Sequence, residues 1–107
     1  MYWSVIASSN NGSDTSRTMQ ERTVTIVNKL GLHARAASKF VNLAKRFAAK
    51  VEVVSPVKTV DGKSIMSIML LAASQGTEIV LRTDGEDEVE AMQAIDALIA
   101  DRFGEGE

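Results

Sequence analysis

The chain has 107 residues, 45% of them hydrophobic, and a formal net charge of −2. This size and composition predict one soluble domain with one hydrophobic core, and the charge is too small to indicate a nucleic-acid partner. The sequence contains no cysteine and one histidine, His33. This excludes a disulfide framework, a thiolate metal site and a zinc site built from several imidazoles of one chain.

The hydrophobic pattern along the chain also excludes other classes of protein. No apolar run approaches the roughly 20 residues that a membrane helix needs, and the start lacks the basic and apolar regions of a signal peptide. We therefore expect a cytoplasmic protein with no membrane insertion. Residues 8–18 are almost all Ser, Asn, Gly, Asp and Thr, a composition typical of disorder. Residues 1–18 are expected to be a disordered extension or the product of a misplaced start codon, and the folded domain is expected to span residues 19–107.

The first half of this domain alternates strand and helix patterns. Residues 23–27 are β-branched throughout and predict a strand. After a loop, apolar residues recur at helical spacing over residues 34–49, which predicts an amphipathic helix. Residues 51–54 predict a second strand, and residues 57–60 predict a short third strand after a turn at Pro56.

The second half continues the alternation. Ser64 is a favoured N-cap residue before an apolar helix over residues 65–73. Residues 78–83 predict a fourth strand. Residues 86–102 predict a last helix with acidic residues in its first turn, and residues 104–107 are expected to be a frayed tail. The resulting order, β-α-β-β-α-β-α, is typical of an α+β sandwich, an open antiparallel sheet with helices on one face.

His33 is placed where a loop meets the start of the first helix. The backbone N–H groups of Ala34, Arg35 and Ala36 would lack partners inside that helix, and such a terminus binds anions. Arg35 adds a permanently charged guanidinium. A nucleophilic nitrogen beside an anion pocket and a cation suits reversible phosphoryl transfer, which depends mainly on positioning and charge neutralisation. A histidine that only caps the helix is the alternative, and the spacing by itself does not distinguish the two.

Three stretches of the chain resemble one known family. Residues 28–37, NKLGLHARAA, are similar to the active-site signature of HPr, the histidine phosphocarrier of the bacterial phosphoenolpyruvate-dependent phosphotransferase system. Residues 61–69, DGKSIMSIM, resemble its second signature, around a regulatory serine. Residues 74–81, SQGTEIVL, followed by DGEDE, resemble its fourth strand and the start of its last helix. Because the distances between the stretches also fit, residues 19–107 are identified as a member of the HPr family.

This resemblance implies a fold and a function. The four strands would form an antiparallel sheet in the order 1-4-2-3, covered on one face by three helices. His33 would carry a phosphoryl group on Nδ1, received from phosphorylated enzyme I and passed to a IIA-type acceptor for sugar uptake. Arg35 and the backbone of residues 34–36 would bind that group. The protein would be a monomeric carrier without cofactor or metal, and not an independent enzyme.

The second signature implies a regulatory role for Ser64, as the target of an HPr serine kinase/phosphorylase. The alternative is that Ser64 is only an N-cap, because the preference of serine for this position is by itself enough to explain the residue. The apolar helix that follows would present a surface for docking partners, because methionine adapts to several of them, unless all of its apolar residues belong to the core. The candidate docking residues are Ile65, Met66, Met69, Leu70 and the basic Lys39.

Two other functions are compatible with the same residues. One is a mainly regulatory phosphoprotein of a transport-free or nitrogen-linked branch, and the other is a non-phosphorylated interaction module in which His33 is only a cap. One position departs from the family, since Ala36 stands where a proline usually follows the arginine. Proline would remove one N–H. Alanine keeps it as an additional donor, so we expect a functional site with an altered phosphate lifetime.

Overall fold

The computed structural model of this chain describes residues 19–106, and the predictions for residues 1–18 lie outside them. Its elements follow one another in this order: β1 (Gln20–Thr25), α2 (Ala34–Ala44), β2 (Lys50–Val54), β3 (Thr59–Asp61), α3 (Ile65–Leu70), β4 (Glu78–Asp84), α4 (Glu88–Ala100) and the 3₁₀ turn η1 (Arg102–Gly104). No helix among residues 19–106 has the length and apolar composition needed to cross a membrane.

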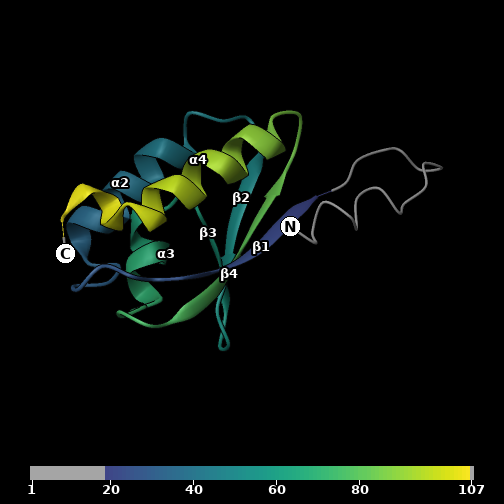
Figure 1. Ribbon diagram of the computed structural model, residues 1–107. Helices are drawn as coiled ribbons and strands as arrows, with labels where there is room; N and C mark the ends of the chain where they lie inside the picture. Colours follow the sequence, from purple (N-terminus) through teal and green to yellow (C-terminus); the bar gives the residue numbers. More distant parts are fainter. Residues whose placement is uncertain (1–18, 107) are drawn as a thin grey trace.

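The four strands form one antiparallel sheet in the order β1-β4-β2-β3. The three α-helices lie together on one side of this sheet (Figure 1). The predicted α+β open-faced sandwich and its strand order, 1-4-2-3, are therefore confirmed. The strand alternation explains the core, because every second residue of β4 is buried against the helices. Ile79 and Leu81 of β4 pack there with Phe40 of α2, Ile68 of α3 and Ile95 of α4.

The largest differences from the predicted strand boundaries are in β1 and β3. β1 begins at Gln20 because Gln20 pairs with Thr83 of β4, and it ends at Thr25. β3 begins at Thr59 and does not include Val57, whose exposed fraction is 81%. The hydroxyl of Ser55 accepts hydrogen bonds from the backbone N–H groups of Val57 and Lys58, and this turn replaces the expected strand residues.

α2 and α3 are both shorter than predicted. α2 ends at Ala44, since the N–H groups of Ala48 and Ala49 donate to the carboxylate of Asp87 at 2.9 and 2.8 Å. α3 ends at Leu70. Beyond it, Ala72 adopts a left-handed conformation with φ of 50°, so the helix does not reach residue 73.

The C-terminal segment differs most from the prediction. α4 spans Glu88–Ala100, and the chain then turns through η1 with positive φ at both Arg102 and Phe103. The Phe103 side chain is fully buried in the core. Gly104 and Glu105 are consequently anchored beside the start of α2 and do not form a frayed tail, and the expectation for Glu107 lies outside the described residues.

Candidate functional site

His33 is the N-cap residue of α2. Its backbone is extended, its carbonyl accepts from the N–H of Ala37 at 2.8 Å, and its Nδ1 accepts from the N–H of Arg35 at 3.3 Å. The preceding loop brings it there through Gly31, whose φ is +69° and where a Cβ would lie 2.4 Å from the carbonyl oxygen of Ala73. Only glycine fits this approach. The loop therefore fixes the imidazole at the helix start, with 27% of its side-chain surface exposed.

The backbone donors predicted around His33 lie where the sequence placed them. Among the described residues, the N–H groups of Ala34 and Ala36 have no protein acceptor, as expected for the first turn of a helix. The N–H of Arg35 already points toward Nδ1. Three successive donors at the positive end of the α2 dipole thus border the imidazole.

Glu105, which is not among the predicted site residues, contacts His33 directly. Its Oε2 lies 2.6 Å from Nε2 of His33, and its Oε1 accepts from Nδ2 of Asn28 at 3.0 Å. Only 9% of the Glu105 side chain is exposed. Burial by itself would raise the pKa of Glu105, but hydrogen bonds from Asn28 and His33 and the nearby charge of Arg35 outweigh burial and hold it below its ordinary value. Glu105 is accordingly ionised at neutral pH.

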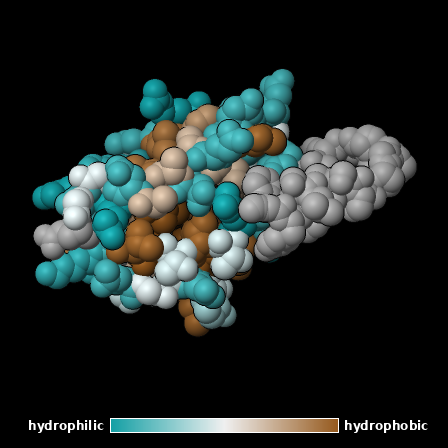
Figure 2. All heavy atoms as spheres, viewed as in Figure 1, coloured by the Kyte–Doolittle hydropathy of each residue, from teal (hydrophilic) through white to brown (hydrophobic). Residues whose placement is uncertain are grey.

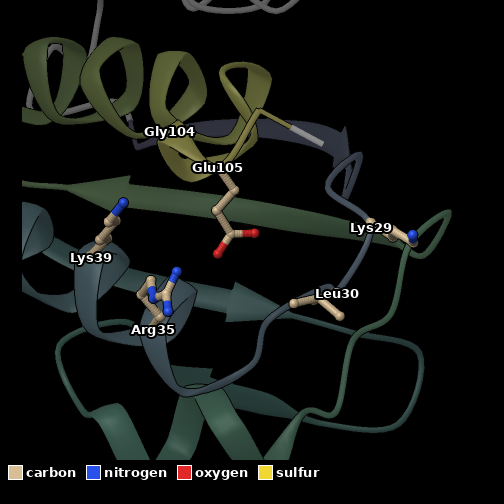
Figure 3. A pocket seen from close by; sticks show the side chains of 6 residues that line it. All are labelled: Lys29, Leu30, Arg35, Lys39, Gly104 and Glu105. Atoms are coloured by element: carbon tan, nitrogen blue, oxygen red, sulfur yellow. The ribbon is translucent and has the colours of Figure 1, made fainter.

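A pocket of about 390 Å³ opens beside this contact. Figure 3 shows the carboxylate of Glu105 reaching down from the segment after α4 toward Arg35, with Lys39 and Lys29 on either side. Lys39, predicted as a docking residue, donates from Nζ to the carbonyl oxygen of Phe103 at 2.7 Å and so holds the C-terminal turn. The pocket combines three cationic side chains, which favours binding of an anion.

Ser64 lies at the opposite end of the helical layer. Its hydroxyl accepts from the N–H of Ser67 at 3.3 Å, so it is the N-cap that the sequence predicted. The neighbouring Lys63 donates from Nζ to the carbonyl oxygen of Phe47, beyond the C-terminus of α2. By contrast, Ala73, beyond the C-terminus of α3, accepts from the N–H of Leu32 next to His33. α3 therefore runs antiparallel to α2, and the structure does not bring Ser64 and His33 together.

The side chains between these two ends form an apolar surface. All four predicted docking residues of α3 are exposed, and among the residues of this helix only Ile68 enters the core. Leu30, from the loop before His33, is 68% exposed and also lines the pocket. In Figure 2 hydrophobic spheres gather at the level of α3, bordered by hydrophilic ones. The exposed fractions of the four residues are 37% for Ile65, 69% for Met66, 39% for Met69 and 64% for Leu70.

No group of three or more potential metal-ligating side chains occurs in the part of the chain that the structure describes. The groups gathered around His33 are therefore its own imidazole, the backbone donors of α2, the guanidinium of Arg35 and the buried carboxylate of Glu105. Such a set can hold and release a small anionic group at one ring nitrogen.

Comparisons with known proteins agree with this chemistry. Residues 20–101 match the family model described as PTS HPr component phosphorylation site. The phosphocarrier protein HPr of Cupriavidus necator is 55% identical over 89 residues, which cover 83% of this chain and all of that protein. HPr of Pseudomonas putida is 56% identical over 90 residues with the same coverage. The crystal structure of HPr-C-His from Thermoanaerobacter tengcongensis superposes with a TM-score of 0.78 at 46% identity, covering 80% of this chain and 97% of that one.

Proposed function

Because this chain belongs to the HPr family of phosphocarrier proteins of the phosphotransferase system, we propose that His33 accepts a phosphoryl group from phosphorylated enzyme I and passes it to a IIA-type acceptor. The observation that carries the proposal is the position of the imidazole. Nδ1 lies at the N-terminus of α2 beside the N–H of Arg35, and the ring is partly exposed. A phosphoryl group on Nδ1 would meet backbone donors at once, without a change of fold.

The residues around Nδ1 support a direct displacement. The lone pair of Nδ1 attacks phosphorus, the bond between phosphorus and the donor's nitrogen breaks, and the electron pair of that bond stays on the donor. In this proposal the N–H groups of Arg35 and Ala36, in the first turn of α2, and the guanidinium of Arg35 would bind the phosphoryl oxygens. Since the site is open to solvent on one side, an acceptor nucleophile can attack the same phosphorus in the next step.

In this proposal the apolar surface of α3 docks both partners in turn. Four exposed apolar residues beside a cationic pocket suit a transient interface with an apolar centre and an acidic rim on the partner. The loop before His33 meets the chain just after α3, where the N–H of Leu32 donates to the carbonyl oxygen of Ala73, so a partner docked on α3 would also reach the imidazole. The protein then works as a carrier that its partners phosphorylate and dephosphorylate, and the served branch is sugar uptake.

Ser64 is proposed as the target of an ATP-dependent HPr serine kinase. Its side chain is partly exposed and caps α3, so a phosphate there would sit at a helix terminus and leave the fold intact. It would place about two negative charges beside Ile65 and Met66, at one end of the docking surface. Repulsion of an acidic partner surface would then slow phosphorylation of His33 without touching the imidazole.

The test of the central proposal is a phosphorylation assay with purified components. Labelled phosphoenolpyruvate and enzyme I should place acid-labile, alkali-stable label on the wild-type chain and none on His33→Ala. Addition of a IIA domain from a sugar branch should then remove the label. A wild-type chain that stays unlabelled, or a His33→Ala variant that is labelled as fast, would refute the carrier function.

Regulation at Ser64 has a separate test. With ATP and a purified HPr kinase, the wild-type chain should be labelled and Ser64→Ala should not, whereas Ser67→Ala should still accept label. Equal labelling of wild type and Ser64→Ala would show that another residue is the target.

A further inference from the structure

Both ring nitrogens of His33 have a partner, and the two partners differ in kind. A backbone N–H can only donate, so the contact from Arg35 at 3.3 Å requires a lone pair on Nδ1. An ionised carboxylate can only accept, so the 2.6 Å contact with Glu105 requires a proton on Nε2. The neutral ring that satisfies both contacts carries its proton on Nε2 and its free electron pair on Nδ1.

Asn28 fixes the position of the carboxylate. Its side chain is fully buried, and Nδ2 donates both to the carbonyl oxygen of Gly31 at 2.8 Å and to Oε1 of Glu105 at 3.0 Å. Both of these partners are acceptors, so the amide cannot be flipped without placing its oxygen against two other oxygens. Oε1 of Glu105 is thereby held, and Oε2 is left to face the imidazole.

The backbone also holds Glu105 in place, at a conformational cost. Arg102 and Phe103 adopt left-handed conformations with φ of 56° and 54°, which non-glycine residues rarely do. The buried ring of Phe103 and the hydrogen bond from Lys39 to its carbonyl oxygen stabilise this turn. Strained backbone that is held by surrounding contacts is concentrated at functional sites, and here it delivers a single carboxylate to His33.

We propose that Glu105, oriented by Asn28, is the positioning residue that selects Nδ1 of His33 as the nucleophile. The inference rests on the proposed function of His33 and names the groups in this chain that determine which nitrogen reacts. Glu105 covers Nε2 and keeps its proton there, so only Nδ1 presents an electron pair to phosphorus. When the bond from Nδ1 to phosphorus forms, Nε2 retains its proton and the ring becomes cationic. The carboxylate then neutralises that charge at a distance of 2.6 Å.

The test uses phosphoramidate, a small phosphoryl donor that needs no partner protein. Attack of a ring nitrogen on its phosphorus breaks the P–N bond and releases ammonia, and NMR of the ¹⁵N-labelled product shows which nitrogen carries the phosphoryl group. In the wild-type chain we expect phosphorylation on Nδ1, in excess over Nε2 by roughly tenfold or more. In Glu105→Ala we expect a large share of the product on Nε2, because the carboxylate no longer covers it.

Glu86→Ala is the matched control. It removes the same charge from an exposed position before α4, whereas Glu105 follows that 13-residue helix, about 20 Å away along its axis. The control should keep the wild-type preference for Nδ1. A purely structural role of Glu105 would change stability or overall yield but not the nitrogen that reacts. An unchanged preference in folded Glu105→Ala would overturn the proposal.

The wild-type chain alone gives a second measurement, which decides the question even if Glu105→Ala does not fold. The ¹⁵N spectrum of the neutral, unphosphorylated ring should show a proton on Nε2 that exchanges slowly with water, and an unprotonated Nδ1. A proton on Nδ1 would overturn the proposal. Neither experiment uses enzyme I, so a failure of the partner reaction would refute the carrier function while leaving the selection of Nδ1 to be judged separately.

Discussion

The two ends of α4 each place one carboxylate on the region around α2, and the two carboxylates do different things. Asp87, before α4, accepts from the N–H groups of Ala48 and Ala49 and closes the loop after α2. Glu105, after α4, accepts from Asn28 and contacts His33. Backbone donors cannot change their protonation, so the Asp87 contact is structural. The imidazole is the group that we propose to be phosphorylated, so in this proposal the Glu105 contact affects the chemistry of the site.

The largest effect is expected from removing the Phe103 side chain, which anchors the turn between α4 and Glu105. Phe103→Ala should lower the free energy of unfolding by about 3–5 kcal/mol, because a fully buried aromatic ring is lost from the core. Urea denaturation measures this directly. Val57→Ala is the control, since a side chain that is 81% exposed should contribute no more than about 0.5 kcal/mol. Similar values for both variants would show that the C-terminal turn is not anchored as described.

The next effect concerns the cation beside His33. Arg35→Ala should slow phosphorylation by enzyme I by about 10- to 100-fold, because a charge-assisted contact to the phosphoryl oxygens is lost. The rate of label incorporation measures it. Arg46→Ala, which removes an exposed charge beyond the C-terminus of α2, should react at nearly the wild-type rate. Equal slowing by both substitutions would mean that the rate of phosphorylation depends on the net charge of the protein and not on the position of Arg35.

A smaller effect is expected where this chain departs from its family. Ala36→Pro removes an N–H that has no acceptor within residues 19–106, so the fold should tolerate it. The phosphohistidine should lose one donor and hydrolyse a few times faster, since a single hydrogen bond contributes about 1 kcal/mol. Timed hydrolysis of the phosphorylated chain measures this. An unchanged lifetime would show that the additional N–H does not contact the phosphate.

The smallest effect should appear only in the pH dependence of stability. Hydrogen bonds from the N–H groups of Ala48 and Ala49, together with the charge of Lys63, outweigh desolvation and lower the pKa of Asp87 below its ordinary value of 3.8. The ionised Asp87 therefore contributes fully to the free energy of unfolding well above its ordinary pKa of 3.8, and this contribution is lost as the pH falls through the lowered pKa. Asp87→Asn should be less stable than wild type at pH 7, and the difference should shrink at lower pH. A difference that stays constant from pH 7 to pH 2 would contradict the role of the charge.

The elements that local pattern determines were predictable from the sequence. The alternation in β4 and the capping positions of His33 and Ser64 depend on neighbouring residues, and the structure confirms them. The end of α2 was not predictable, because the helical pattern continues past Ala44 and the group that stops the helix, Asp87, is distant in sequence.

The contact of Glu105 was missed for a similar reason. A Gly-Glu-Gly-Glu ending is typical of a frayed tail, and the left-handed turn that orders it falls on Arg102 and Phe103, not on glycine. One signal was available, since the apolar Phe103 continues the helical spacing just before the tail and so indicates an anchored segment. The sequence could not decide whether the predicted docking residues of α3 are exposed or buried in the core. A helix that is apolar on all sides does not reveal which of its faces is buried.

The most direct measurement locates the phosphoryl group after reaction with phosphoenolpyruvate and enzyme I. NMR of the uniformly ¹⁵N-labelled chain should show a new phosphorus–nitrogen bond at Nδ1 of His33 and a proton retained on Nε2 facing Glu105. A phosphoryl group on Nε2 would contradict the assignment of Nδ1 as the nucleophile. An imidazole that remains unmodified while other residues are labelled would contradict the assignment of His33 as the carrier.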